Sequence, residues 1–181
     1  GALDDATAIA AVEVAAGVGI TLFDTAPLYG RGLSEHRIGT ALRRRPRASF
    51  VLATKVGRVY APAPAGVRDR GGYVGGLPFE GRFDYSRDGC LRSLEQSLLR
   101  LGVASVDIAL VHDLDPWAHG DALDTRIRDV LDGAWRALVE HHGTIEGTHL
   151  RTLFAEDTRR GERLSCEAAG GKRLASCGTS V

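Results

Sequence analysis

Three short runs of apolar residues stand out from a mixed chain, and each of them ends on a polar side chain. The runs extend over Gly19–Asp24, Phe50–Lys55 and Val106–His112. Continuous apolar runs of this length are typical of strands that are buried on both faces, as the strands of parallel sheets are. The pattern therefore predicts three parallel strands.

Segments with apolar residues at helical spacing separate and follow these runs. We predict helices at residues 5–16, 35–45, 87–101 and 129–142. Asp4 and Asp5 favour the start of the first helix, and Ser34 and Ser86 are the predicted N-caps of the second and third. Gly102 is the predicted stop of the third helix.

The alternation of strands and helices predicts a parallel sheet with right-handed crossover connections. An open doubly wound sheet and a (β/α) barrel both fit this α/β pattern. If Asp24, Lys55 and His112 point to one face of the sheet, the aliphatic residues two positions before them share that face. Aliphatic layers capped by polar strand ends are typical of a barrel interior with its site at the C-terminal mouth. The pattern therefore favours the barrel.

Two stretches depart from the alternation. Arg58–Tyr85 is rich in Gly and Pro, and we predict a long irregular loop. Its aromatic residues indicate packing near a site, and an ordered surface loop is the alternative. Gly143–Val181 is rich in Gly, Arg, Ser and Thr, with one short candidate helix at His149–Asp157. We therefore divide the chain into a sheet-forming part, residues 1–142, and a divergent, irregular tail, residues 143–181. A flexible terminus and a change of reading frame both explain such a tail.

Composition and charge exclude several classes of function. Of 181 residues, 44% are hydrophobic and 25% charged, and the formal net charge is zero, so no overall field attracts nucleic acid or an anionic membrane. No apolar run approaches the length of a membrane span. Cys90, Cys166 and Cys177 have neither a disulfide nor a zinc pattern. We therefore expect a cytoplasmic protein without a metal site.

The polar residues at the strand ends form the candidate site. Asp24, Lys55 and His112 end the predicted strands, and Tyr29 lies in the loop after the first. The carboxyl ends of parallel strands lie along one edge, where catalytic residues collect. Tyrosine is a weak acid at neutral pH, a nearby ammonium stabilises its phenolate, and a carboxylate fixes the ammonium. Together with a histidine that orients a carbonyl, these groups suit proton transfer to a carbonyl oxygen.

Each of these residues also has a purely structural interpretation. Tyr29 could be an amphipathic surface residue, Asp24 could bind loop amides, and His112 could be a core histidine. Lys55 is harder to explain in this way, because the chain has 21 Arg residues and only 2 Lys residues. Arginine does not replace lysine where a compact point charge is needed.

The same residues resemble a known family. Phe23–Gly30, followed by Gly32–Glu35, is similar to the first signature of the aldo-keto reductases, and Lys55 and His112 match that family's remaining catalytic positions. The loop after Lys55 and the His112–Asp113 pair look most like the branch that contains D-threo-aldose (L-fucose) 1-dehydrogenase and pyridoxal 4-dehydrogenase. The resemblance extends from about residue 5 to residue 140.

This resemblance implies a (β/α)8 TIM barrel and an oxidoreductase that transfers hydride between NADP or NAD and an aldehyde or the hemiacetal of an aldose. Tyr29 would be the general acid/base, Lys55 and Asp24 its tuning pair, and His112 the residue oriented toward the substrate. The family's residue at Asp24 also lies close to the nicotinamide ribose, so Asp24 is the expected cofactor-binding residue.

The resemblance stops before the second half of the barrel, which supplies most of the cofactor's binding residues in the family. We therefore expect a partial (β/α)8 TIM barrel, first half only, followed by a non-matching tail, and poor cofactor binding by the isolated chain. Two other functions stay open. One is a catalytically inactive truncated remnant or frameshifted product, and the other is a barrel aldolase with Lys55 as the Schiff-base nucleophile.

Overall fold

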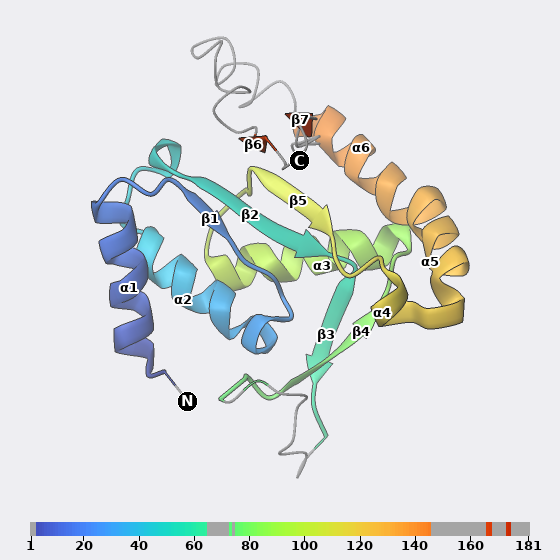
Figure 1. The fold of residues 1–181 in the computed structure, drawn as a ribbon, viewed down its shortest axis with the longest axis horizontal. Coiled ribbons are helices and arrows are strands. Elements are labelled where there is room, and N and C mark those ends of the chain that lie inside the picture. Colours follow the sequence, from blue (N-terminus) through green and yellow to red (C-terminus); the bar gives the residue numbers. More distant parts are fainter. Residues whose placement is uncertain (1–2, 65–72, 74, 146–165, 168–172, 175–181) are drawn as a thin grey trace.

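The three predicted strands form one parallel sheet in the computed structural model of the chain (Figure 1). They are β1 (Leu22–Asp24), β2 (Val51–Val56) and β5 (Ile108–Val111), and their order in the sheet is β1-β2-β5. The structure describes residues 3–64, 73, 75–145, 166–167 and 173–174. The outer strands β1 and β5 are shorter than their apolar runs. Each of them pairs with the central strand β2.

The predicted helices form beside this sheet. Asp4 caps the first, since its carboxylate accepts from the backbone N–H of Thr7 at 2.8 Å, and Ser86 caps the third. Gly102 follows the third helix with a φ of 66°, which glycine adopts without strain. The helical segments are α1 (Asp5–Gly17), α2 (Leu33–Leu42), α3 (Arg87–Leu101), and a continuous run of α5 (Leu123–Asp129), the π-helical turn η4 (Val130–Ala134) and α6 (Trp135–Ile145).

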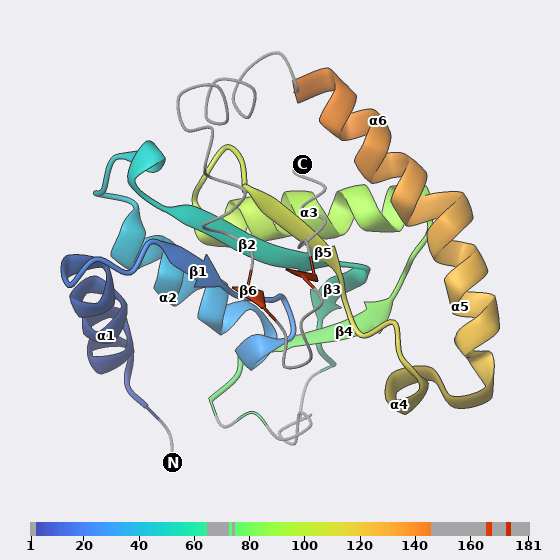
Figure 2. The ribbon, with the colours of Figure 1, turned by 45° about the horizontal axis from the view of Figure 1, so that its top comes forward.

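The helices form a layer that covers one face of the sheet. Figures 1 and 2 show α1 and α6 at opposite ends of this layer, with α2 and α3 between them. Phe23, Leu52 and Ala109, one from each strand, are buried together with Leu94 of α3 and Leu138 of α6 in one apolar core. This helix-covered face therefore holds the core of the described part of the chain.

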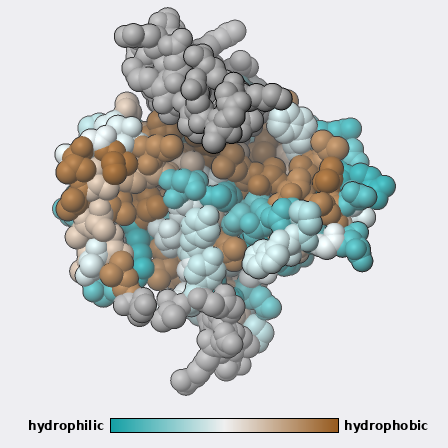
Figure 3. Space-filling model, viewed as in Figure 1, coloured by the Kyte–Doolittle hydropathy of each residue, from teal (hydrophilic) through white to brown (hydrophobic). Residues whose placement is uncertain are grey.

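The opposite face of the sheet, which we call the open face, is only partly buried. Leu22 on β1 is 47% exposed and Leu110 on β5 is 42% exposed, whereas Val51 and Ala53 of the central strand are buried. The register places Leu22 beside Val51 and Leu110 beside Lys55, so these side chains share the face. Figure 3 shows hydrophobic residues bordering a group of hydrophilic ones on the side of the molecule that Figure 1 presents.

The prediction of an irregular loop over residues 58–85 is wrong at both ends of this segment, because both ends form strands. Strands β3 (Arg58–Pro62) and β4 (Phe79–Phe83) pair antiparallel. Gly81 faces Tyr60 in this ladder, and a Cβ on Gly81 would lie 2.7 Å from the Tyr60 ring. Because glycine and proline count against a strand in a single sequence, this pairing is hidden until the partner strand is known.

The start of α2 also differs from the prediction. The helix begins at Leu33 with Gly32 at the N-cap, so Ser34 lies inside the first turn and is not the cap. The 3-10 turn η1 (Tyr29–Gly32) leads directly into α2 and leaves no extended residue before Ser34. The Ser34 hydroxyl instead lies 2.9 Å from the Thr25 hydroxyl and ties α2 to the loop after β1.

The segment before the last long helix is more regular than predicted. It contains α4 (Pro116–His119), whose N-cap Asp115 accepts from the backbone of Ala118, and the 3-10 turn η3 (Gly120–Ala122). The helical run that follows therefore starts at Leu123, six residues before its predicted start. A further 3-10 turn, η2 (Arg47–Ser49), precedes β2.

In the tail, the described residues form two short antiparallel strands, β6 (Cys166–Glu167) and β7 (Arg173–Leu174). The candidate helix at His149–Asp157 lies outside the described residues. Within the part of the chain that the structure describes, no helix combines the length and the apolar character needed to cross a membrane.

Candidate active site

Lys55 and Asp24 meet at the open face of the sheet. The Lys55 ammonium donates to both carboxylate oxygens of Asp24, at 3.0 and 2.9 Å, and to the backbone carbonyl of Thr25 at 2.9 Å. These contacts occupy its three donors. The Lys55 side chain is 13% exposed and that of Asp24 is 49% exposed, so the pair presents a carboxylate to solvent while its cation is held below.

Tyr29 lies over this pair at the start of the turn η1. The Lys55 Nζ atom is 5.0 Å from the centroid of the Tyr29 ring, so the ammonium faces the ring. The turn is built from left-handed residues, with φ of 62° at Gly30 and 95° at Gly32, which favour glycine. The Gly30 carbonyl also accepts from the backbone of Leu77, so the stretch before β4 holds the turn from the outside.

His112 follows the last residue of β5 and is 4% exposed. Its ring is perpendicular to that of Tyr29, with 6.1 Å between the centroids. Its backbone N–H donates to the Val56 carbonyl at 3.0 Å, and its own carbonyl accepts from the Tyr85 hydroxyl at 2.6 Å. The structure thus brings the four predicted side chains, Asp24, Tyr29, Lys55 and His112, to one edge of the sheet.

Burial keeps the imidazole of His112 neutral at neutral pH. Burial, together with the nearby cations Arg58 and Lys55, lowers the pKa of His112 from its ordinary 6.5 to about 4. The carboxylates of Asp113 and Asp24 act in the opposite direction but do not compensate. Nδ1 of the ring is buried without a hydrogen-bond partner among the described residues.

Residues around His112 that the sequence did not place in the site form a second layer. Arg58 Nη2 lies 2.6 Å from Asp113 Oδ2, and the Arg58 guanidinium packs 3.9 Å from the centroid of the Phe83 ring. The Tyr85 hydroxyl lies 3.0 Å from His119 Nε2, and burial raises the pKa of Tyr85 to about 12, so it stays protonated. The position of Asp113 next to His112 could have indicated its role, but Arg58 and Tyr85 gave no comparable signal.

A buried ion pair supports the strand that carries Lys55. Glu35 of α2 has no solvent exposure; it accepts from the Thr54 hydroxyl at 2.7 Å and pairs with Arg100 Nε of α3 at 2.6 Å. Thr54 points to the helix-covered face, directly before Lys55 on the open face. This network locks β2 against α2 and α3 without contributing a group to the site.

The residues that the structure describes contain no group of three or more His, Cys, Asp and Glu side chains arranged to hold a metal ion. Cys90 is a free, buried thiol in the core, and burial raises its pKa to about 12. What the site does provide is a tyrosine whose ring faces a fixed cation, a half-exposed carboxylate and a neutral imidazole. These groups can give or take one proton and orient a polar substrate atom.

Comparison with known proteins matches most of the chain to one family. The sequence model of the Aldo/keto reductase family matches residues 1–146. Pyridoxal 4-dehydrogenase of Microbacterium luteolum is 38% identical over 154 residues, which cover 78% of this chain and 45% of that protein. D-threo-aldose 1-dehydrogenase of a Pseudomonas species is 37% identical over 116 residues, 62% of this chain and 35% of that protein.

Among solved structures, the holo form of aldo-keto reductase AKR11C1 from Bacillus halodurans superposes with a TM-score of 0.55 and 26% identity. The match covers 79% of this chain and 39% of that structure. The chain thus spans less than half the length of each of these relatives. A shorter match is of another kind: glucose-6-phosphate isomerase of Nitrosospira multiformis is 60% identical over 37 residues, 20% of this chain and 7% of that protein.

Proposed function

The chain belongs to the aldo/keto reductase family, and from this premise we propose that it carries the proton-transfer site of an NAD(P)-dependent oxidoreductase. The proposed reaction moves hydride between the nicotinamide and an aldehyde or sugar hemiacetal. The observation that carries the proposal is the Lys55–Asp24 pair beneath the Tyr29 ring, beside the neutral His112. The fold supports it, because the chain is a partial (β/α)8 TIM barrel whose site lies at the C-terminal ends of its strands.

In this proposal Tyr29 transfers the proton to or from the substrate oxygen. The positive charge of Lys55 favours the phenolate that remains when the proton leaves, and Asp24 holds that charge in place. His112 is neutral, so its ring orients the substrate oxygen as a hydrogen-bonding group without adding a charge. A proton donor beside a fixed cation, together with a neutral orienting group, can serve the reduction of a carbonyl.

The described residues fit one part of a nicotinamide cofactor. Asp24 presents a half-exposed carboxylate that could accept from ribose hydroxyls, and Leu110, which lies beside Lys55 in the sheet, adds an exposed apolar side chain at the site. When bound, the nicotinamide would supply the hydride. The choice between NADP and NAD does not follow from these residues, since nothing in this group faces an adenosine phosphate.

The substrate class in this proposal comes from the relatives. The two dehydrogenases named above act, by their names, on pyridoxal and on D-threo-aldoses. Both names describe small polar carbonyl or hemiacetal compounds, which suit a site with one proton donor and one neutral imidazole. We propose the same class for this chain and place the protein in the cytoplasm, as its cysteine usage suggests.

The two alternative functions are a Schiff-base aldolase and an inactive remnant. A Schiff-base aldolase needs a lysine with a free, deprotonated amine, whereas the Lys55 ammonium is bound by Asp24 and Thr25. The geometry therefore favours proton relay over nucleophilic attack. An inactive remnant would have the same pair, and only measurement of turnover and of cofactor binding distinguishes it.

We assign the tail a separate origin. The family match ends at residue 146, and the isomerase match spans 37 residues, close to the number that remains. We infer that the tail, and not the barrel part, is the isomerase-like segment. Alignment of residues 143–181 alone with the isomerase tests this inference, and a match that falls within residues 1–142 would overturn it.

A Tyr29→Phe variant tests the proposed function. We expect loss of about 100-fold or more in turnover, the usual contribution of a general acid, with cofactor affinity almost unchanged. The measurement is NAD(P)-linked oxidation of aldoses by residues 3–145 joined to the C-terminal half of the M. luteolum enzyme, with calorimetry for cofactor binding. Tyr73→Phe, at an exposed tyrosine, is the matched control. Turnover within a few-fold of the parent would contradict the role of Tyr29.

The same calorimetric experiment on the 181-residue chain distinguishes an enzyme from a remnant. We expect weak or undetectable binding of NADP and NAD, because the described residues that could hold the cofactor would contact only its nicotinamide end. Micromolar binding by the chain alone would overturn this expectation and would support an active site that is complete as it stands.

A further inference from the structure

The backbone carbonyl of His112 lies just beyond the end of the parallel ladder. The His112 N–H still donates to the Val56 carbonyl at 3.0 Å, as in a parallel pair of strands. If the ladder continued, the His112 carbonyl would accept from the backbone N–H of Arg58. Strand β2 ends at Val56, however, and Gly57, with a φ of 97°, turns the chain into β3. The position of His112 therefore depends on the group that replaces this ladder bond.

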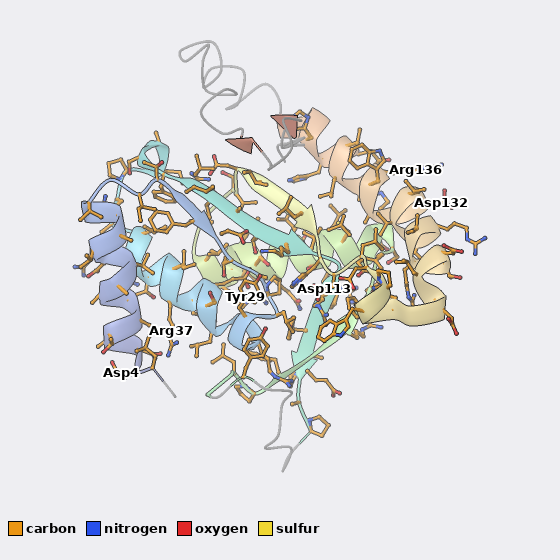
Figure 4. The ribbon with its side chains drawn as sticks, in the orientation of Figure 1. Asp4, Tyr29, Arg37, Asp113, Asp132 and Arg136 are labelled. Carbon is orange, nitrogen blue, oxygen red and sulfur yellow. The ribbon has the colours of Figure 1, made fainter. Side chains whose placement is uncertain are left out.

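The hydroxyl of Tyr85 takes the place of the missing donor. It donates to the His112 carbonyl at 2.6 Å and lies 3.4 Å from the carbonyl of Asp113. Tyr85 is 2% exposed, and burial raises its pKa to about 12, so the hydroxyl keeps its proton and stays a donor. Asp113 has a φ of 51°, in the left-handed region that most side chains avoid, so the contact lies at a turn that must be held. Figure 4 shows Asp113 near the middle of the molecule, as Tyr29 is.

The oxygen of this hydroxyl has a second partner in α4. His119 Nε2 lies 3.0 Å from it. Because the one proton of the Tyr85 hydroxyl goes to a carbonyl, which can only accept, the imidazole is the donor in this contact. The His119 ring also packs on the Phe83 ring, with 4.4 Å between the centroids. Two hydrogen bonds in series thus connect His119, through Tyr85, to the backbone of His112.

The ring and the backbone of Tyr85 are both immobilised. A Cβ on Gly57 would lie 2.5 Å from the Tyr85 ring, so this glycine leaves the space that the ring fills beside the end of β2. The Tyr85 carbonyl accepts from the backbone N–H of Ala134 at 2.9 Å, and a Cβ on Gly133 would lie 2.6 Å from the same oxygen. Both of these residues belong to the π-helical turn η4. Contacts with the end of β2, with η4 and with α4 therefore fix the direction of the hydroxyl.

We propose that Tyr85 is a positioning residue whose buried hydroxyl, held by His119, replaces the ladder bond and fixes the backbone from which the His112 ring faces Tyr29. The two rings are perpendicular, with 6.1 Å between their centroids, and a shift of the His112 backbone would change this arrangement. Tyr85 acts through that backbone and transfers no proton. The role in catalysis rests on the proposed function, because the place of the ring matters for turnover only if His112 orients the substrate.

The test is NMR of the aromatic rings in the 181-residue chain, with the signals of the two rings identified by their absence in His112→Gln and Tyr29→Leu. In the parent chain we expect nuclear Overhauser contacts between these rings. Tyr85→Phe keeps the ring beside Gly57 and removes the hydroxyl. It should weaken the contacts by about fivefold, because the unpaired carbonyl must move to find another partner. Tyr60→Phe, at another buried tyrosine, is the matched control and should leave the contacts unchanged.

Variants of His119 decide the matter if Tyr85→Phe does not fold. His119→Leu removes the donor to the Tyr85 hydroxyl and should weaken the same ring contacts by about twofold. His119→Gln, whose amide can donate to the hydroxyl, should restore most of the parent intensity. Circular dichroism and urea unfolding show which variants fold. Absence of the ring contacts in the parent, unchanged contacts in a folded Tyr85→Phe, an equal loss in Tyr60→Phe, or equal spectra for the two His119 variants would overturn the proposal.

These spectra do not depend on turnover, so they separate the two proposals. If Tyr29→Phe keeps full activity while the ring contacts of His112 depend on Tyr85, the positioning role holds and the proposed reaction fails. If Tyr29→Phe is inactive while the ring contacts do not depend on Tyr85, the reaction holds and the positioning role fails.

Discussion

The two faces of the parallel sheet differ in what completes them. On the helix-covered face, Phe23, Leu52 and Ala109 are buried by helices that lie between the strands in the sequence. On the open face, Leu22 and Leu110 are about half exposed, although they belong to the same strands. In a closed barrel the second face is the interior, where side chains from all eight strands fill the space. The described strands can bury one face with their own helices, but they cannot fill the other.

The site lies on the incomplete face, and its supports come from the complete one. Lys55 and Asp24 point to the open face, whereas the adjacent Thr54 is held by Glu35 on the covered face. The geometry of the proton-transfer groups therefore depends on packing that the described residues already have. The proton-transfer residues can therefore be in place in a chain whose open face still limits cofactor binding.

The largest difference between the faces should appear when the buried ion pair of the covered face is broken. Arg100→Ala leaves the fully buried Glu35 carboxylate without its cation and should lower the free energy of unfolding by about 3–5 kcal/mol. Arg37→Ala removes the partner of Asp5 in an exposed pair at 2.7 Å and should cost below about 1 kcal/mol. Urea denaturation of both variants measures the contrast, and equal losses would show that the Glu35 network does not anchor β2.

A pair of leucines tests the two faces directly. Leu52 on the covered face is 1% exposed, and Leu52→Ala should destabilise the chain by about 3 kcal/mol through lost burial and a cavity. Leu22→Ala, the same change on the open face, should cost below about 1 kcal/mol. The midpoints of urea unfolding give both values. A loss at Leu22 as large as that at Leu52 would mean that the open face is covered in solution.

The smallest effect is the pH dependence of the unfolding free energy that His112 contributes. Its pKa in the folded chain is about 4, below the ordinary 6.5, so below pH 6.5 the unfolded chain binds a proton that the folded chain does not. Stability from this residue is complete above pH 6.5 and is lost as the pH falls toward 4, by about 2 kcal/mol at pH 4.5. The measurement is unfolding free energy against pH for the parent minus that for His112→Gln. A flat difference between pH 7 and pH 4.5 would contradict the neutral, buried imidazole.

Much of the fold follows from local sequence. The caps at Asp4 and Ser86, the stop at Gly102 and the three strands are where the pattern predicts them, because caps and periodicity act over a few residues. The parallel order of the strands follows from the helices between them. The proximity of Asp24, Lys55 and His112 follows in turn, since parallel strands end on one edge.

The errors share one cause, which is dependence on a distant partner. The β3–β4 hairpin forms because Tyr60 finds Gly81, and Ser34 leaves its cap position because η1 runs straight into α2. Glu35 is buried against Arg100, 65 residues away. Local propensity carries no information about such partners.

By itself, the sequence determined the order of the elements, the polar ends of the strands and the family, because these are properties of short segments and of their spacing. Only the tertiary structure decided that Lys55 gives all its donors to Asp24 and Thr25, that His112 is buried and neutral, and that Asp113 is held by Arg58. The physical reason is that charge state and side-chain direction depend on burial and on neighbours brought together from distant parts of the chain.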